Sequence, residues 1–162
     1  MKTIVFERDP NILAIEDVAH QPFRWSIGLD GSKFFQEIAE REVLVGIRCP
    51  KCKRVYVPPR QVCGPCFTKM DELVDLGKEG VIEAITVVNY PFIDPDTGEM
   101  RPVPYFYGYI KLDGADNLFS HIVQMKPGQS ISIGDRVRAV FAPIKQGRIQ
   151  DIAYFESVET SQ

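Results

Sequence analysis

Apolar residues in the second half of the chain recur in short runs that are separated by turn residues. Five of these runs are rich in β-branched and aromatic side chains and predict strands, at residues 81–90, 105–113, 118–124, 135–143 and 149–155. Glycine lies between several of them, as in Asp113-Gly114 and Gly134-Asp135. Five strands in about 80 residues, without a long helix, predict a small closed barrel of the OB-fold type.

The first half of the chain has a different pattern. Residues 32–43 predict a helix whose N-cap is Asp30 or Ser32. The apolar face of this helix contains Phe34, Phe35, Ile38 and Ala39. Alternating apolar residues at 43–47 and a further run at 54–57 then predict two short strands. The protein is therefore predicted to be mainly β, with one N-terminal helical segment.

The charge of the chain is slightly acidic. The 19 Lys and Arg residues and 22 Asp and Glu residues give a formal net charge of −3, which offers no general attraction to nucleic acid or to an anionic membrane. No run approaches the roughly 20 apolar residues of a membrane helix, and the N-terminus lacks the apolar core of a signal peptide. These features predict a cytoplasmic protein without a membrane partner.

The four cysteines lie close together in two Cys-x2-Cys pairs, Cys49 with Cys52 and Cys63 with Cys66. Four thiolates at this spacing suit a tetrahedral zinc ion with zinc–sulfur distances of about 2.3 Å. Two redox dithiols, an iron–sulfur site and disulfides are the alternatives. One pair suffices for a redox motif, however, and a disulfide framework spreads its cysteines along the chain. The spacing therefore predicts one bound zinc ion.

A zinc ion with four cysteine ligands has no open position for water or substrate, so the predicted site is structural and not catalytic. Such an ion stabilises a segment that is too small to build its own core. The chain then divides into an N-terminal extension and helix at residues 1–45, a zinc ribbon at 46–76 and a barrel at 77–162.

The first part of the predicted ribbon is basic. Residues 48–60 contain no Asp or Glu and five basic residues, Arg48, Lys51, Lys53, Arg54 and Arg60. One interpretation is a surface for phosphates or for an acidic partner. The other is a solvated segment whose cations offset the charge of the zinc thiolates. The sequence leaves both interpretations open.

The connection between the first two barrel strands is unusually long. It covers residues 91–104, whereas hairpin loops usually have about two to five residues. Its apolar residues are Phe92, Ile93, Met100 and Val103, and they lie among prolines that keep the segment out of a sheet. This segment is predicted to be either an ordinary loop on the barrel or a docking arm for a partner.

The sequence does not suggest a self-sufficient enzyme. The two histidines are His20 and His121, and His121 falls in a predicted strand, where a hydrogen-bonded structural role is the preferred interpretation. No cysteine is left as a nucleophile once zinc is bound. The sequence also lacks a Gly-x-Ser-x-Gly motif and a phosphate-binding loop.

Nucleic-acid binding is the main alternative function, because OB barrels commonly bind single strands with a basic groove and stacking aromatic residues. Tyr105, Tyr107 and Tyr109 share one face of a predicted strand, although a barrel wall or a protein interface explains them equally well. Acidic residues outnumber basic ones by ten to seven in residues 81–162. This charge makes nucleic acid an unlikely partner.

The order of these features resembles a known family. A Phe-Phe helix is followed by Cys-x2-Cys, a Pro-Pro-Arg segment, a second Cys-x2-Cys and a five-strand barrel. The matching stretches are residues 33–35, 47–52, 57–66, 80–88 and 133–137. This combination resembles the domain-of-unknown-function proteins that join a rubredoxin-like zinc ribbon to an OB-fold and are often described as acyl-CoA-associated.

The resemblance implies a function. Members of this family accompany thiolase-fold enzymes as small non-catalytic subunits, so it implies a hetero-oligomer that forms or cleaves carbon–carbon bonds in acyl-CoA substrates. It also implies that a coenzyme A thioester is shared with the partner subunit. The candidate CoA-binding residues are then Arg48, Lys51, Lys53, Arg54, Arg60, Phe34 and Phe35. The candidates for partner docking are Phe92, Ile93, Met100 and Val103.

Overall fold

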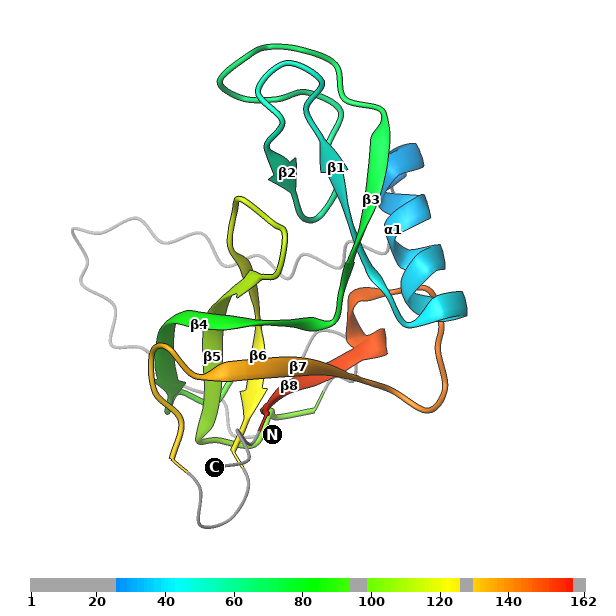
Figure 1. The fold of residues 1–162 in the computed structure, drawn as a ribbon. Coiled ribbons are helices and arrows are strands. Elements are labelled where there is room, and N and C mark those ends of the chain that lie inside the picture. The colour runs from blue at the N-terminus through cyan, green and yellow to red at the C-terminus, as the bar shows by residue number, and fades with distance from the viewer. Residues whose placement is uncertain (1–25, 94–98, 126–129, 159–162) are drawn as a thin grey trace, which may run out of the picture.

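A computed structural model describes residues 26–93, 99–125 and 130–158 of the chain. Within these ranges, one α-helix, one short 3-10 helix and two groups of strands make up the fold, as Figure 1 illustrates. The first group, here called the ribbon, follows helix α1 (Gly28–Arg41) and contains β1 (Leu44–Arg48), β2 (Val55–Tyr56) and β3 (Glu72–Gly77). The second group, here called the barrel, contains β4 (Glu79–Val88), β5 (Tyr105–Leu112), β6 (Phe119–Gln124), β7 (Arg136–Phe141), the short 3-10 helix η1 (Ile149–Asp151) and β8 (Ile152–Ser157).

The barrel closes in the strand order β4-β5-β6-β8-β7. Neighbouring strands are antiparallel except β6 and β8, which run parallel and pair Val123 with Phe155. Strand β4 contains a bulge between Ile82 and Ala84, which helps it bend so that its first residues pair with β7 while its full length pairs with β5. This arrangement is the Greek-key barrel of the OB-fold, and it confirms the predicted fold class.

The last barrel strand begins later than the sequence pattern predicts. Residues 149–151 form η1, and β8 starts only at Ile152. The cause is Asp151, whose carboxylate is buried. It accepts hydrogen bonds from the backbone N–H groups of Gln146, Gly147 and Arg148 at 2.7 to 3.2 Å. These bonds hold the chain in a tight turn where apolar periodicity alone predicts extended backbone.

Helix α1 is present but begins four residues before the predicted start. Its first amide, Gly28 N–H, donates to the hydroxyl of Ser26 at 3.1 Å. Neither predicted N-cap residue caps the helix: Asp30 lies in the first turn, and Ser32 Oγ donates to the Gly28 carbonyl from inside the helix at 2.7 Å. The helix ends at Glu42, which adopts the left-handed conformation with φ 55°. Within the described ranges, no helix has the length and apolar character needed to cross a membrane.

The ribbon is built on β1, the central strand of the antiparallel sheet β2-β1-β3. Leu44 to Ile47 are all buried, so the strand does not show the predicted alternation. Leu44 and Val45 pack in the main core, whereas Ile47 packs in a smaller core around the cysteines. The predicted boundary between residues 45 and 46 falls inside this strand.

Strand β3 is not predicted by the sequence pattern. Its exposed residues include two carboxylates, Glu72 and Asp75, which are unfavourable in strands. It forms because its backbone pairs with β1 from Leu44↔Gly77 to Arg48↔Glu72. A long-range pairing of this kind overrides the weak local preference, and the ribbon therefore extends from residue 44 to residue 77.

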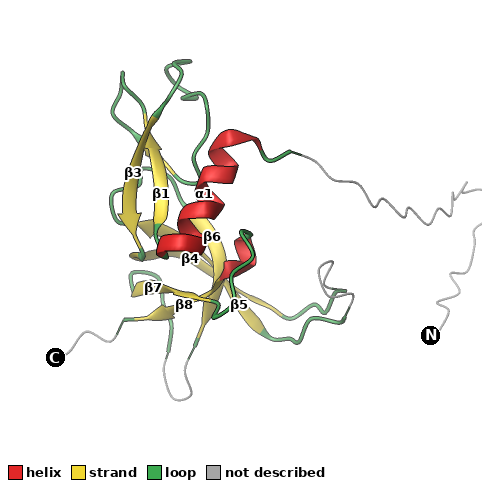
Figure 2. Ribbon diagram, turned by 90° about the vertical axis from the view of Figure 1, so that its right-hand side faces the viewer, coloured by secondary structure: helices red, strands yellow, loops and turns green. Residues whose placement is uncertain are grey.

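Helix α1 packs against both the ribbon and the barrel. Phe34 and Ile38 are 1% and 0% exposed and belong to one core cluster with Val57 of the ribbon segment and Ile110 of the barrel. The ring centroid of Phe34 lies 6.4 Å from that of Phe119 in β6. The helix lies along the ribbon sheet and reaches the barrel at its C-terminal end (Figure 2). The three parts consequently share a continuous apolar core.

The turn between β5 and β6 closes the free edge of β2. The Val55 N–H donates to the Asp116 carboxylate at 2.8 Å, and the Asp116 N–H donates to the Val55 carbonyl at 2.8 Å. The Asn117 side chain then bonds both backbone groups of Val57: its Oδ1 accepts from the N–H at 2.8 Å, and its Nδ2 donates to the carbonyl at 2.6 Å. The turn rises from the barrel to β2 in Figure 1. It pairs with this edge much as another strand would.

His121 in β6 is a core residue. It is 8% exposed, and its Nδ1 accepts the Ile122 N–H at 2.7 Å, which agrees with the predicted hydrogen-bonded role. Its imidazole centroid lies 6.0 Å from that of Phe119 and 5.9 Å from that of Phe155. Burial lowers the pKa of His121 below its ordinary value of 6.5. The imidazole is therefore a neutral part of the aromatic core.

The contact of Asn117 with Val57 provides a test of how the ribbon is held. Asn117→Asp keeps the size and the acceptor but replaces the Nδ2 donor by a carboxylate oxygen that faces the Val57 carbonyl. We expect a loss of about 1–3 kcal/mol in the free energy of unfolding at pH 7, measured with urea. The loss should shrink below about pH 4, because a protonated carboxyl can donate to the carbonyl again.

Asp116→Asn is the matched control. The amide oxygen still accepts the Val55 N–H, so this variant should lose less than about 1 kcal/mol. Equal losses from both variants, or no loss from Asn117→Asp, would show that the edge contact does not hold the ribbon.

Candidate functional site

The sulfur atoms of the four cysteines gather at one point of the ribbon. The Sγ atoms of Cys49, Cys52, Cys63 and Cys66 all lie within 4.8 Å of one another. The Sγ atoms of Cys52 and Cys63 are 3.7 Å apart. A tetrahedron of thiolates at about 2.3 Å from a zinc ion has edges of about 3.8 Å. The spacing of the sulfur atoms thus fits a zinc ion, as predicted.

The two cysteine pairs are held by equivalent backbone turns. The Lys53 N–H donates to the Cys49 carbonyl at 2.9 Å, and the Phe67 N–H donates to the Cys63 carbonyl at 2.8 Å. Lys53 and Phe67 each follow the second cysteine of a pair, and both adopt positive φ angles, 64° and 50°. Each turn brings its two sulfur atoms to the same side. The two turns are the loops farthest from the barrel in Figure 1.

Contacts within the cluster shift the pKa values of Cys63 and Cys66 in opposite directions. The Tyr56 hydroxyl lies 3.5 Å from Cys63 Sγ, and this hydrogen bond lowers the pKa of Cys63 to about 6. The hydrogen bond with Cys52 and burial raise the pKa of Cys66 to about 12. Several thiolates so close together repel one another, and a divalent cation removes that repulsion. The donor set therefore suits a soft divalent ion such as zinc, which would tie the two turns together.

Two of the predicted basic residues converge on Tyr56. The guanidinium carbon of Arg60 lies 3.6 Å from the centroid of the Tyr56 ring. A hydrogen bond with the Tyr56 side chain raises the pKa of Arg54. Arg48 differs, because its guanidinium forms an ion pair with Glu72 at 2.8 Å. Arg54 and Arg60 therefore contact the same tyrosine, and they are the strongest candidates for an anion site.

The other predicted CoA-binding residues differ in their exposure to solvent. Lys51 and Lys53 are exposed on the first cysteine turn. Phe34 is 1% exposed in the core, and Phe35 is partly buried against it, with the two ring centroids 5.4 Å apart. Core packing thus accounts for Phe34, and this side chain is not accessible to a ligand.

The predicted arm folds back on itself. Ile93 and Met100 form an antiparallel bridge and are 64% and 60% exposed. The Arg101 N–H donates to the Phe92 carbonyl at 2.9 Å, and the Arg101 guanidinium lies 5.6 Å from the Phe92 ring centroid. Phe92 is 37% exposed, whereas Val103 is half-buried. The arm thus presents Ile93 and Met100 most fully to solvent, while residues 94–98 lie outside the described part of the chain.

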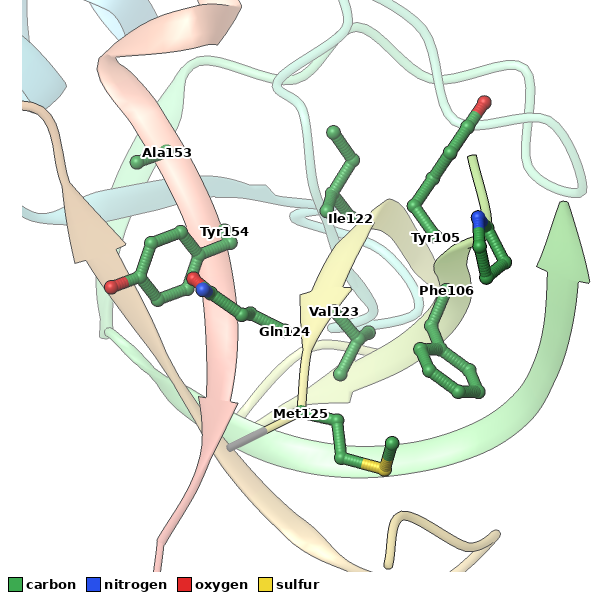
Figure 3. A pocket seen from close by; sticks show the side chains of 9 residues that line it. Tyr105, Phe106, Ile122, Val123, Gln124, Met125, Ala153 and Tyr154 are labelled. Carbon is green, nitrogen blue, oxygen red and sulfur yellow. The ribbon is translucent and has the colours of Figure 1, made fainter. Parts of the chain in front are cut away.

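An apolar groove of about 440 Å³ lies on the barrel beside the base of the arm. Figure 3 shows side chains from β5, β6 and β8 around it. Its lining includes Tyr105, Phe106, Ile122, Met125 and Tyr154, and none of the described residues that line it is charged. The sequence pattern does not predict this groove, because its residues come together only when the barrel closes. Its lining suits an apolar group and not a phosphate.

The sequence pattern also does not predict the exposure of Phe67. This residue is 87% exposed on the second cysteine turn. Its position directly after Cys66 is a signal that the sequence does contain. The residue that follows the second cysteine of such a turn takes a positive φ here, which favours glycine, and an aromatic residue is unexpected there.

Metal content tests the cysteine site. The purified protein should contain about one zinc ion per chain, and Cys63→Ser should lower the content several-fold because one ligand is lost. Chelation should increase hydrogen exchange in residues 49–70, while β4 to β8 keep their protection. The barrel has its own core residues, and the ribbon core around the cysteines is small.

Thr68→Ser is the matched control, because it keeps the hydroxyl that donates to the Cys66 carbonyl at 3.1 Å and changes no ligand. This variant should retain its zinc. A purified protein without zinc, whose exchange pattern is the same before and after chelation, would contradict the assignment.

Profiles of two known domains match the chain. The ChsH2 rubredoxin-like zinc ribbon domain matches residues 36–71, and the ChsH2 C-terminal OB-fold domain matches residues 73–142. A DUF35 domain-containing scaffold protein of Methanocaldococcus jannaschii is 34% identical over 113 residues, which cover 69% of this chain and 77% of the relative. A protein of the same description from Methanothermobacter thermautotrophicus is 33% identical over 115 residues, which cover 69% of this chain and 81% of the relative.

Two solved structures share the fold. One is a DUF35 family protein of unknown function from Sulfolobus solfataricus, with a TM-score of 0.56, 19% identity and coverage of 80% of this chain and 84% of the other. The other is described as the Ltp2-ChsH2(DUF35) aldolase, with a TM-score of 0.59, 22% identity and coverage of 83% and 98%. These matches confirm the resemblance seen in the sequence. The chain belongs to the DUF35 family, whose members join a zinc ribbon of the ChsH2 type to an OB-fold barrel.

Proposed function

We propose that this chain is a non-catalytic subunit of a thiolase-type complex that forms or cleaves carbon–carbon bonds in acyl-CoA substrates. Its role is to assist assembly of the complex and binding of the acyl-CoA. One observation carries the proposal: the packed ribbon and barrel present two separate surfaces. These are a cationic surface on the ribbon and an exposed apolar arm on the barrel. The first suits an anionic ligand and the second suits a protein partner.

The relatives support an accessory role. Two of them are described as scaffold proteins, and one structural neighbour is described together with an aldolase. The described part of this chain also lacks a visible acid–base or nucleophilic pair. The cysteines form the zinc site, and His121 is buried and neutral at physiological pH. The carbon–carbon chemistry then belongs to the partner, which we propose to be thiolase-like and cytoplasmic.

The proposed ligand contact is electrostatic. Coenzyme A carries several phosphate charges, and the neighbouring guanidinium groups of Arg54 and Arg60 can donate charge-assisted hydrogen bonds to them. The Tyr56 ring supports both groups, and the adjacent zinc site fixes the segment that carries them. Lys51 and Lys53 add to the attraction of the same surface. In this arrangement the ribbon holds the nucleotide end while the acyl end reaches the partner.

The proposed partner contact is apolar. Ile93 and Met100 are exposed at the described ends of the arm, and the bridge between them pairs these two ends. A preorganised segment loses little conformational entropy on docking. The arm leaves β5 at Tyr105, whereas the other end of β5 leads into the turn that holds the ribbon. The eight residues of β5, about 25 Å of strand, therefore lie between the base of the arm and the turn that holds the ribbon.

Reconstitution tests the proposal. The native protein should co-purify with a thiolase-type enzyme, and the recombinant enzyme should need this chain for full activity or stability. This chain alone should have no thiolase activity. The proposal fails if the enzyme is fully active and stable alone and the two proteins elute separately.

Arg60→Ala tests the ligand contact in the assembled complex. We expect the KM for acyl-CoA to rise about tenfold with little change in kcat, which corresponds to the loss of one charged hydrogen bond of about 1.4 kcal/mol. Lys78→Ala is the control, because it removes the same charge from the exposed junction of β3 and β4. A KM that both variants leave unchanged would remove the ribbon from the CoA site.

A further inference from the structure

Phe67 combines two unfavourable features. It is 87% exposed, so a large aromatic side chain contacts mostly water. Its φ angle is 50°, in the left-handed region that glycine adopts readily and bulky residues rarely adopt. Strained residues of this kind persist where the surrounding structure fixes them, and they cluster at functional sites.

The second cysteine turn fixes Phe67 from both sides. The Phe67 N–H donates to the Cys63 carbonyl at 2.8 Å, and the Cys63 N–H donates to the Thr68 carbonyl at 3.0 Å. The Thr68 hydroxyl also donates to the Cys66 carbonyl at 3.1 Å. A zinc ion between the four sulfur atoms would make this turn still more rigid. The Phe67 ring therefore projects from the end of the ribbon on a backbone that is already ordered.

An ordered, exposed aromatic side chain is well suited to bind a protein. Its ring offers a large apolar surface and has only two side-chain torsions to lose on binding. Aromatic residues that fill a pocket supply much of the energy of many interfaces. The residue at the equivalent position of the first turn is Lys53, with φ 64°. The strained conformation thus belongs to the turn, whereas the apolar ring belongs to Phe67 alone.

The charge around Phe67 limits the kind of partner. Residues 48–72 contain six Lys and Arg residues and two acidic residues, Asp71 and Glu72, of which Glu72 pairs with Arg48. Their formal charge stays positive when four thiolates and one zinc ion are included. Lys53 is exposed on the first cysteine turn. Lys69 is exposed in the hairpin that contains the second turn, where it pairs with Val62. A complementary surface must therefore provide an apolar pocket with acidic residues around it.

We propose that Phe67 is a docking knob that inserts into an apolar pocket with an acidic rim on the catalytic subunit. The inference rests on the proposed function, because that function supplies the partner. It adds a contact at the ribbon that is separate from the arm. The knob would hold the ribbon, and with it Arg54 and Arg60, against the subunit that carries out the chemistry.

Phe67→Gly gives a sharp test. The substitution removes the ring and relieves the positive φ, so the zinc content should be unchanged and the melting temperature equal or higher. The Kd for the co-purifying catalytic subunit, measured by calorimetry with zinc-loaded protein, should rise about 30-fold or more. Phe67→Trp keeps a large apolar ring and should retain most of the affinity.

Two controls separate the knob from general effects. Glu42→Gly relieves a positive φ of 55° at the C-terminal end of α1 without removing a ring, and it should leave the Kd unchanged. Ile144→Ala removes a large side chain that is 77% exposed but lies in the barrel half of the chain. It should leave the Kd unchanged.

The outcomes distinguish the two proposals. If the wild-type chain forms no complex with a catalytic subunit, the proposed function is wrong and this inference falls with it. If the complex forms and Phe67→Gly binds as tightly as wild type, only the knob is wrong. The knob is also overturned if Phe67→Gly leaves the complex intact but abolishes either self-association in sedimentation or binding to phosphatidylserine vesicles, because another occupant then explains the exposed ring.

Discussion

The side chain of Asn117 bonds to both backbone groups of Val57, and the other features of the structure depend on this contact and its neighbour at Asp116. Strand β2 has only two residues and would otherwise leave an open edge. Without the contact, the ribbon would be connected to the barrel mainly through the Gly77 junction and α1. With it, a turn of the barrel becomes part of the ribbon sheet. The orientation of the cysteine turns is thereby tied to the barrel.

Different forces stabilise different levels of the molecule. Burial of Phe34 and Ile38 between the ribbon and the barrel holds the parts together. The cysteine site, by contrast, acts locally, because the core around it is small and consists of Ile47, Tyr56 and Met70 beside the sulfur atoms. The exposed residues belong to neither core, so they can vary without loss of the fold. Cations lie on the ribbon, apolar side chains lie on the arm, and an uncharged groove lies on the barrel.

The sequence is informative where the determining interaction is local. The spacing of Cys49, Cys52, Cys63 and Cys66 predicts the metal site, because each pair is brought together by its own turn. Alternation over several residues likewise predicts the barrel strands.

The rest could not be predicted, because it depends on contacts between distant residues. Strand β3 forms by pairing with β1, the late start of β8 follows from Asp151, and Asn117 recognises Val57 across 60 positions. Arg54 and Arg60 appear in the sequence as members of a basic run, and only the structure shows that both meet at Tyr56. The exposure of Phe67 also could not be predicted from the sequence, although its position directly after Cys66 is one indication of it.

The ribbon and the barrel share one core, and we infer that they move as one rigid body, so that the cationic surface and the arm keep a fixed separation. Residual dipolar couplings of the backbone N–H groups in the zinc-loaded protein test this rigidity. One alignment tensor should fit the amides of β1 to β3 and those of β4 to β8 together. Two tensors that differ in orientation or magnitude would show that the ribbon moves independently of the barrel, and would contradict the fixed separation.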